Sequence, residues 1–239
     1  MNRLYVPSLG PTDWRRLLAD PLKHWKPRHS ALELAVSWEA VRNSERGLPP
    51  SVQEALDKVD ELRGTSLVIG LPEHVVNFEG GGHGSQNDLW TLLRVGSKYV
   101  SMTIEAKAGE ALDDIVSVWL QKKRSKSSKK PTRLAALRGV LGIQDIKIDS
   151  IRYQLLHRAA SALREAERFS AQYAVMLVQS FNEQADQESR NDFLNFASVM
   201  GTQVPTGQIA RVGRSTSTPL YIGWVPTPPA TVDTLSAAI

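Results

Sequence analysis

The stretch SQNDLWTLLRVGSKYVSMTIEAKA, residues 85–108, decides the fold because it encodes two strands joined by a tight turn. Strand-like runs lie on both sides of Gly96-Ser97, and a glycine-led two-residue loop between such runs predicts a β-hairpin. In this hairpin Val95 pairs with Lys98. A symmetric four-residue loop keeps the same register, whereas a three-residue loop would break it.

Alternation of side chains along the two strands gives the hairpin an apolar face and a mixed face. On the apolar face, which we expect to pack against helices, lie Leu89, Thr91, Leu93, Val95, Lys98, Val100, Met102 and Ile104. On the mixed face lie Asp88, Trp90, Leu92, Arg94, Tyr99, Ser101, Thr103 and Glu105. The register places Asp88 directly opposite Glu105, and Lys107 follows on the same face.

Two opposed carboxylates at the end of a strand pair need a physical reason, because like charges directly opposite each other are destabilising. A bound divalent cation supplies one, since Mg²⁺ takes one or two carboxylates together with waters. An ammonium group beside the metal orients an attacking water and stabilises charge on a phosphoryl oxygen. Asp88, Glu105 and Lys107 therefore have the chemistry of a metal-dependent phosphodiester hydrolase. The alternative is a surface charge pair, but the apolar opposite face and the glycine cluster at residues 80–84 favour the metal site.

Length and composition restrict the class of protein. The chain has 239 residues, of which 41% are hydrophobic and 23% charged, as is typical of a globular protein. The absence of cysteine excludes disulfide frameworks, cysteine zinc sites and thiol nucleophiles. No apolar run approaches the ~18–20 residues of a membrane span, and residues 1–16 lack the apolar core of a signal peptide. We expect a cytoplasmic protein without a membrane partner.

The formal net charge of +4 is unevenly distributed. Residues 122–133 contain seven Lys and Arg residues and no acid, so the rest of the chain carries a net charge of −3. Because this run follows the Glu105 strand by one helix, we expect it at the mouth of the site, where phosphate contacts would make affinity salt-dependent. Its serines and lysines also suit a solvated loop. The expected nucleic-acid contacts in it are Lys122, Lys123, Arg124, Lys126, Lys129 and Lys130.

The remaining patterns predict helices, three strands, helices, a strand, a helix and two closing strands. A long amphipathic helix is expected over residues 151–169, and the continuous apolar run at 173–181 is typical of a central strand buried on both faces. This order predicts one α/β domain with a mixed sheet. We expect a helical part over residues 1–63, a core over 64–225 and a loose tail over 226–239.

Asp88, followed after one strand and a tight turn by Glu105-Ala106-Lys107, resembles the motif of the PD-(D/E)XK nuclease superfamily, which has the restriction-endonuclease-like fold. Asn87 stands where the motif has proline, a departure that many members share. By this resemblance, Asp88 and Glu105 hold the metal ion and the carbonyl group of Ala106 adds a ligand. Lys107 would serve the attacking water.

The resemblance covers residues 30–181, whose order of elements is similar to the αβββαβ core of that fold, here with additional N-terminal helices. The stretch WKPRHSALELA, residues 25–35, is similar to one in a bacterial family of unassigned function within the superfamily. The resemblance implies a nuclease that uses Mg²⁺ or Mn²⁺ to hydrolyse phosphodiester bonds, in DNA rather than RNA. Since no DNA-reading motif is evident, sequence specificity is either low or supplied by a homodimer or a protein partner.

Residues outside the motif are candidates for the same site. The first helix of this fold often contributes a glutamate, which makes Glu33 a candidate metal ligand, although Ser30-x-x-Glu33 also has the pattern of a capping box. Glu39 is a candidate ligand or the partner of a buried arginine. The helix after the three strands often supplies a Gln or a basic residue. Gln154 and Arg158 share one helix face and are candidates for catalysis and nucleic-acid contact, or for surface contacts.

Other interpretations are consistent with the same residues. A non-catalytic module of the same fold would bind nucleic acid or protein, but such a module has little reason to keep two opposed acids. A metal-dependent phosphoesterase would act on a small molecule. His83, in the glycine cluster, is the histidine nearest the carboxylates in sequence and is either solvated or catalytic. We expect Trp14, Trp25 and Trp38 in the core rather than stacked on bases.

Overall fold

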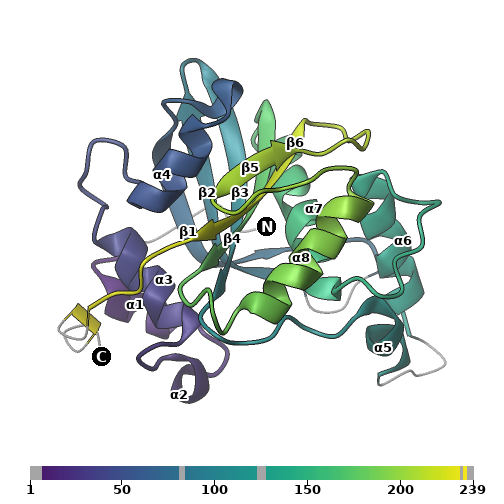
Figure 1. The fold of residues 1–239 in the computed structure, drawn as a ribbon, viewed down its shortest axis with the longest axis horizontal. Helices are drawn as coiled ribbons and strands as arrows, with labels where there is room; N and C mark the ends of the chain where they lie inside the picture. Colours follow the sequence, from purple (N-terminus) through teal and green to yellow (C-terminus); the bar gives the residue numbers. More distant parts are fainter. Residues whose placement is uncertain (1–6, 81–83, 123–127, 232–233, 236–239) are drawn as a thin grey trace.

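The computed structural model describes residues 7–80, 84–122, 128–231 and 234–235. A six-stranded mixed sheet lies between two layers of helices (Figure 1). The elements are α1 (Pro11–Arg15), α2 (Pro21–His24), α3 (Ser30–Glu39), α4 (Pro50–Asp57), the 3₁₀ helix η1 (Asp60–Leu62), β1 (Ser66–Val76), β2 (Ser85–Val95), β3 (Lys98–Lys107), α5 (Val116–Gln121), α6 (Lys130–Leu141), α7 (Tyr153–Arg168), β4 (Tyr173–Ser180), α8 (Gln187–Val199), β5 (Gln208–Arg211) and β6 (Leu220–Pro226).

The sheet has the strand order β1-β2-β3-β4-β6-β5 and combines two kinds of pairing. β1, β2 and β3 are successive antiparallel strands, whereas β3, β4 and β6 run parallel, and β5 is an antiparallel edge strand. Lys107, Ser180 and Pro226 end the three parallel strands in one row. The predicted order of elements and the α/β class with a mixed sheet are therefore confirmed.

The hairpin has the predicted register, since Val95 pairs with Lys98 and Leu89 pairs with Ile104. Gly96 has a φ of +57°, as the first position of a glycine-led turn requires. The apolar face packs against the layer of α1 to α4, as expected. The mixed face is also covered, because α7 lies on it.

Hydrogen bonds from the sheet position α7 over the mixed face. Ser101 Oγ donates to the carbonyl oxygen of Ala162 at 2.8 Å, and Thr103 Oγ1 donates to that of Arg158 at 3.0 Å. Trp90 Nε1 donates in turn to Ser101 Oγ at 2.9 Å. Small side chains such as Ala159 and Ala162 on this helix are fully buried, which lets the helix backbone approach the strands closely. The height and rotation of α7 above β2 and β3 are thereby determined.

β1 differs from the sequence pattern, which predicts two β-branched runs split by Leu71-Pro72-Glu73. The structure has one continuous strand, Ser66–Val76, with a register shift between Leu67 and Ile69. Proline has no backbone N–H to donate to a neighbouring strand, so within sheets it is found on edge strands rather than inner ones. β1 is an edge strand, so Pro72 interrupts neither the strand nor its pairing with β2.

Several predictions about packing are confirmed. Every residue of β4 is buried, as expected for a central strand, and Trp14, Trp25 and Trp38 lie in the core of the N-terminal helical layer. The tail expected to be loose over residues 226–239 is instead attached to the domain in part, since Thr227 N–H donates to the carbonyl oxygen of Ser180 at 2.7 Å and Leu235 is buried. Among the residues that the structure describes, no helix has the length and apolar composition needed to cross a membrane.

The central position of β4 predicts a large effect of side-chain truncation. Leu177→Ala removes a fully buried side chain and is expected to lower the free energy of unfolding by about 2–5 kcal/mol. Leu194→Ala, on the exposed side of α8, should change it by less than about 1 kcal/mol. Urea denaturation of both variants measures the difference. Equal effects would contradict the assignment of β4 to the core.

Candidate active site

The ends of β2 and β3 bring Asp88 and Glu105 together. The amide N–H of Ala106 donates to Asp88 Oδ2 at 2.8 Å, which connects the two strands where their regular ladder ends. The side chain of Glu105 is 2% exposed, whereas that of Asp88 is 24% exposed. The pair therefore combines a buried carboxylate with one that solvent or a ligand can reach.

A third carboxylate, that of Glu73 on β1, continues this line across the sheet and was not predicted from the sequence. The pairs on either side of it in the β1–β2 ladder place Glu73 across from Asp88. Gln86 Nε2 donates to Glu73 Oε2 at 2.6 Å. Pairing residues 66–76 with the strand that contains Asp88 would have placed Glu73 beside it. The sequence pattern instead suggested that Pro72 breaks the strand. We call Glu73, Asp88 and Glu105 the carboxylate row.

Two cations and an amide surround the buried member of the row. Lys107 Nζ lies 2.9 Å from Glu105 Oε1, and Gln154 Nε2 donates to the same oxygen at 2.7 Å. Arg158 Nε donates to Glu105 Oε2 at 2.6 Å, and its Nη2 lies 3.2 Å from Asp88 Oδ1. Gln154 thus reaches the site as predicted from its helix face. Arg158, expected to contact nucleic acid, is 7% exposed and instead bridges two carboxylates.

Burial and the neighbouring charges shift the pKa values of this cluster in opposite directions. Burial, together with the charge of Glu105, raises the pKa of Asp88 to about 6, and burial together with Asp88 raises that of Glu73 to about 8. Burial alone would raise the pKa of Glu105, but Lys107 and Arg158 outweigh it and lower this pKa. Burial alone would lower the pKa of Lys107, but Glu105 and Asp88 outweigh it and raise this pKa. Glu105 and Lys107 are therefore both charged at neutral pH.

The donor chemistry of the row fits a hard divalent cation, because carboxylate and carbonyl oxygens are the ligands that Mg²⁺ and Mn²⁺ prefer. Every oxygen of Asp88 and Glu105 accepts a hydrogen bond from a protein donor in this arrangement. Within the described part of the chain, no three His, Asp or Glu side chains are grouped so as to hold a metal ion. A metal ion held by Asp88 and Glu105 would therefore have to replace Arg158 at one carboxylate or at both.

Glu33 does not join the carboxylate row. It lies on α3, in the helical layer on the opposite side of the sheet from α7. Its Oε2 accepts the amide N–H of Ala230 at 2.7 Å, and its Oε1 lies 3.8 Å from Arg28 Nη1. The capping box is also wrong, because the backbone N–H of Ser30 donates at 2.9 Å to Glu110 Oε1, not to Glu33. Spacing along α3 could not reveal that a loop residue from beyond β3 caps this helix.

Glu39 likewise lies apart from the site. Its Oε1 accepts hydrogen bonds from Trp14 Nε1 at 2.8 Å and from Ser8 Oγ at 2.6 Å. Its Oε2 accepts from Arg42 at 3.3 Å, and the guanidinium of Arg42 is exposed rather than buried. Glu39 therefore connects α1 to α3, and the expected roles as a metal ligand or as the partner of a buried arginine are wrong.

The basic run is only partly described. Outside the described residues lie His83, Lys123, Arg124 and Lys126. Lys129 is exposed, and Lys122 Nζ pairs with Asp114 Oδ2 at 2.5 Å. Lys130 Nζ donates to the carbonyl oxygen of Trp119 at 2.6 Å and lies over its ring. Two of these predicted phosphate contacts are thus engaged within the protein.

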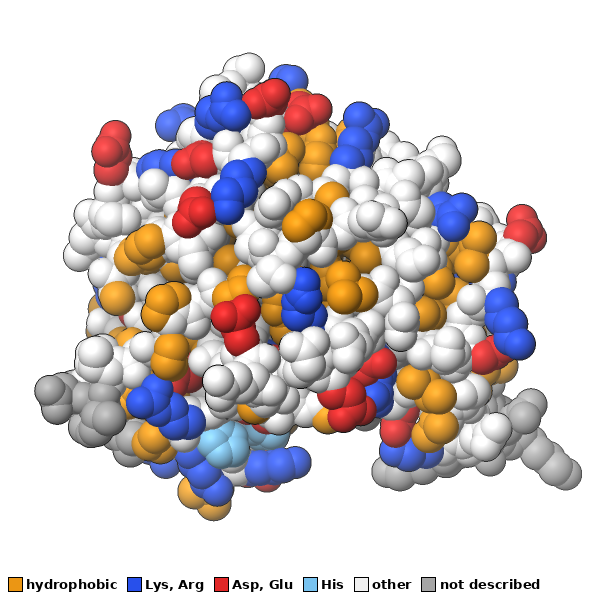
Figure 2. Space-filling model, in the orientation of Figure 1, with side chains coloured by type: hydrophobic (Ala, Val, Ile, Leu, Met, Phe, Trp, Pro, Cys, Tyr) orange, Lys and Arg blue, Asp and Glu red, His pale blue; other side chains and the backbone are white. Residues whose placement is uncertain are grey.

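The surroundings of this run do not form an uninterrupted positive surface. On the face shown in Figure 2, basic and acidic side chains are interspersed.

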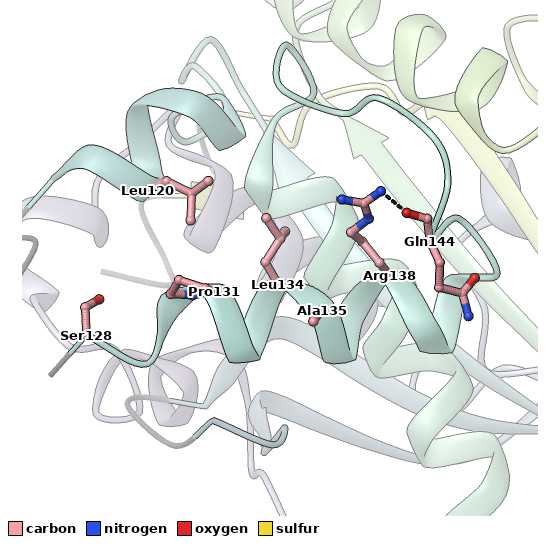
Figure 3. A pocket seen from close by; sticks show the side chains of 7 residues that line it. All are labelled: Leu120, Ser128, Pro131, Leu134, Ala135, Arg138 and Gln144. Carbon is pink, nitrogen blue, oxygen red and sulfur yellow. Dashed lines mark hydrogen bonds between the residues drawn. The ribbon is translucent and has the colours of Figure 1, made fainter.

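A cavity of about 360 Å³ lies between α5 and α6, with Leu120, Pro131 and Leu134 among its lining residues (Figure 3). Arg138 at its margin donates to the carbonyl oxygen of Gln144. This cavity contains no residue of the carboxylate row.

A family model described as a domain of unknown function (DUF6946) matches residues 7–229. The chain belongs to the DUF6946 family. The match spans every strand of the sheet, both helical layers and the carboxylate row, so the DUF6946 domain is the whole fold rather than a part of it. Searches of the curated proteins and of the solved structures found no match to this chain.

His157 on α7 is buried directly behind the site. Its Nδ1 lies 2.6 Å from Ser85 Oγ, at the start of β2. Burial, with smaller contributions from Arg158 and Arg133, lowers its pKa well below the ordinary value. A protonated imidazole would be an uncompensated charge beside two guanidinium groups, so His157 is neutral in the folded protein.

The low pKa of His157 predicts a loss of stability in mild acid. The unfolded chain takes up a proton near pH ~6.5, whereas folded His157 does not, so the free energy of unfolding falls as pH drops below that value. Relative to His157→Asn, the wild type should lose up to about 1.4 kcal/mol per pH unit below this point. Urea denaturation between pH 7 and pH 5 measures it, with the exposed His24→Asn as control. Parallel curves for wild type and His157→Asn would contradict the prediction.

Truncation of Glu105 should destabilise the fold strongly. Glu105→Ala leaves Lys107 and Arg158 buried without their shared counter-ion, which costs about 3–5 kcal/mol. Glu105→Gln keeps the side-chain volume and one carbonyl acceptor, so its cost should be smaller. Glu54→Ala, which breaks the exposed pair with Lys58, should cost less than about 1 kcal/mol. Denaturation in urea ranks the three variants, and an equal cost of Glu105→Ala and Glu54→Ala would show that the buried network carries no stability.

Proposed function

We propose that this domain is a cytoplasmic, divalent-metal-dependent nuclease that hydrolyses phosphodiester bonds, with DNA as its substrate. The observation that supports the proposal is the meeting of Asp88, Glu105 and Lys107 at the adjoining ends of β2 and β3, with Lys107 Nζ 2.9 Å from Glu105 Oε1. Two carboxylates of different exposure and one ammonium group suit phosphoryl chemistry better than they suit a structural salt bridge.

The metal ion would be held by Asp88, Glu105 and the carbonyl oxygen of Ala106. When bound, Mg²⁺ or Mn²⁺ supplies Lewis-acid polarisation of a phosphoryl oxygen and a lowered pKa of water. Lys107 remains protonated because its pKa is raised, so it acts as a hydrogen-bond donor and a positive charge, not as a general base. Gln154 donates to Glu105 Oε1 and so keeps the carboxylate orientation constant while charge develops on the substrate.

The phosphate backbone of DNA requires cationic contacts beyond the site. The run over residues 122–133 supplies a positive charge of seven within a chain that is otherwise slightly acidic. Lys129 is exposed among its described members. We propose that this run binds backbone phosphates, which would make binding weaken steeply as salt concentration rises. A second copy of the chain or a protein partner would supply sequence specificity.

Cleavage assays with conservative variants test the proposal. Wild-type protein with Mg²⁺ or Mn²⁺ should cleave labelled single- or double-stranded DNA, and EDTA should stop the reaction. Asp88→Asn, Glu105→Gln and Lys107→Met should each lower the rate by about 100-fold or more, since each removes a charge acting on the reacting group. Glu167→Gln, an exposed change on α7, is the matched control. Undiminished cleavage by folded Glu105→Gln would overturn the proposal.

A second candidate is a non-catalytic module that binds nucleic acid or protein, and one observation favours it. Arg158 pairs with both Asp88 and Glu105, so the row is largely neutralised without a metal ion. Buried ionic networks of this kind also occur where their role is to specify packing. Thermal shift with Mn²⁺ separates the two functions. A rise in Tm that Asp88→Asn abolishes supports the nuclease, whereas no shift with intact DNA binding supports the module.

A further inference from the structure

A cavity of about 840 Å³ opens at the carboxyl ends of the parallel strands β3, β4 and β6. It is lined by the chain that follows each of these strands, namely Ala108, residues 181–184 and residues 226–229. Crevices outside the carboxyl ends of parallel strands are where α/β proteins bind ligands. The volume also lies within the range of about 300–1,000 Å³ common to ligand sites. We call this cavity the strand-end pocket.

A buried acceptor without a partner lines the strand-end pocket. The side chain of Glu33 is only 1% exposed, and the amide N–H of Ala230 occupies its Oε2 at 2.7 Å. Its Oε1 has no hydrogen-bond partner among the described residues. Arg28 Nη1, at 3.8 Å, is too distant for a hydrogen bond. A buried carboxylate oxygen left unpaired is costly, so the pocket is built for a ligand that donates an N–H group to Glu33.

The other walls indicate the shape and charge of that ligand. Phe181, Pro228 and Pro229 present apolar surfaces, as a flat ring requires. Arg28 is the one cationic side chain among the described lining residues, beside the acids Glu33 and Glu183, and it is 55% exposed. A guanidinium group at a rim suits a phosphate. A flat ring with an N–H donor on one edge and a phosphate attached describes a nucleotide whose base carries an exocyclic amino group.

We propose that the strand-end pocket is a base-recognition site in which Glu33 Oε1 accepts the exocyclic amino N–H of a nucleobase and Arg28 contacts the phosphate of the same nucleotide. The inference rests on the proposed function and names the part of the substrate that this pocket binds. Ala108, which lines the pocket, directly follows Lys107, so the pocket and the carboxylate row meet at the end of β3 on opposite faces of the sheet. Uracil and thymine are disfavoured, because they present a carbonyl oxygen where cytosine presents its amino group.

Binding of dCMP and dUMP tests the proposal, because the two nucleotides differ only at the edge that Glu33 contacts. Both are titrated against the full-length protein in EDTA, with ligand-observed NMR as the readout. dCMP should bind about tenfold more tightly than dUMP. Glu33→Gln should reverse this preference, because the amide keeps its oxygen toward Ala230 N–H and turns its NH₂ group into the pocket as a donor. Glu167→Gln should leave the preference unchanged.

Arg28→Ala supplies an independent variant at an exposed position. It should weaken dCMP and dUMP equally and abolish the advantage of dCMP over deoxycytidine, which has no phosphate. This comparison remains decisive if Glu33→Gln fails to fold by circular dichroism. Absence of binding by both nucleotides, or an unchanged preference in folded Glu33→Gln, overturns the proposal.

Recognition and cleavage are measured separately, so their failures are distinguishable. EDTA removes metal ions, and nucleotide binding therefore does not depend on the carboxylate row being loaded. Selective binding of dCMP without metal-dependent cleavage would contradict the proposed nuclease function and support base recognition in the strand-end pocket. Cleavage of DNA without selective nucleotide binding would contradict base recognition in the strand-end pocket and support the proposed nuclease function.

Discussion

The ionic bridge from Arg158 on α7 to Glu105 and Asp88 on the sheet is the interaction on which this structure depends. Strand register alone places three carboxyl groups side by side, and their ionisation is unfavourable without positive charge nearby. The guanidinium group supplies it, because its planar fork directs Nε to Glu105 and Nη2 to Asp88 at the same time. For Arg158 to reach both acids, α7 must lie close to the strands. The bonds of Ser101 and Thr103 to its carbonyl oxygens hold it there.

The same edge of the sheet is organised by two acids in its loops. Asp186 accepts the N–H of Gly109 at 2.7 Å and the hydroxyl of Ser180 at 2.6 Å, joining the chain after β3 to the end of β4. Glu110 accepts the N–H groups of Ser30 and Ala108, which joins that chain to α3. These bonds hold the carboxylate row on one side of the sheet and the strand-end pocket on the other. The same edge of the sheet thus carries both the carboxylate row and the strand-end pocket.

Predictions from the sequence succeeded where the deciding interactions are local. The turn at Gly96 determined the hairpin register, and the apolar run of β4 determined its burial. The side chain of Gln154 reached Glu105 because helix periodicity placed it on the face toward the sheet. Predictions failed where a distant segment intervened. Glu33 has the spacing of a capping residue, yet Glu110 arrives from beyond β3 and takes the N–H of Ser30.

The sequence by itself determined which residues face each other across the hairpin, because side-chain alternation and turn chemistry act over a few residues. It determined Asp88 opposite Glu105 and Lys107 beside them. Only the tertiary structure decided that Glu73 joins the row, that Arg158 bridges it and that Glu33 lies across the sheet, with one oxygen to which no described residue donates a hydrogen bond. Those placements depend on the pairing of an edge strand through a proline, on the docking of a helix and on the path of a tail. Each is a non-local contact whose geometry arises from packing and is absent from the pattern of any single segment.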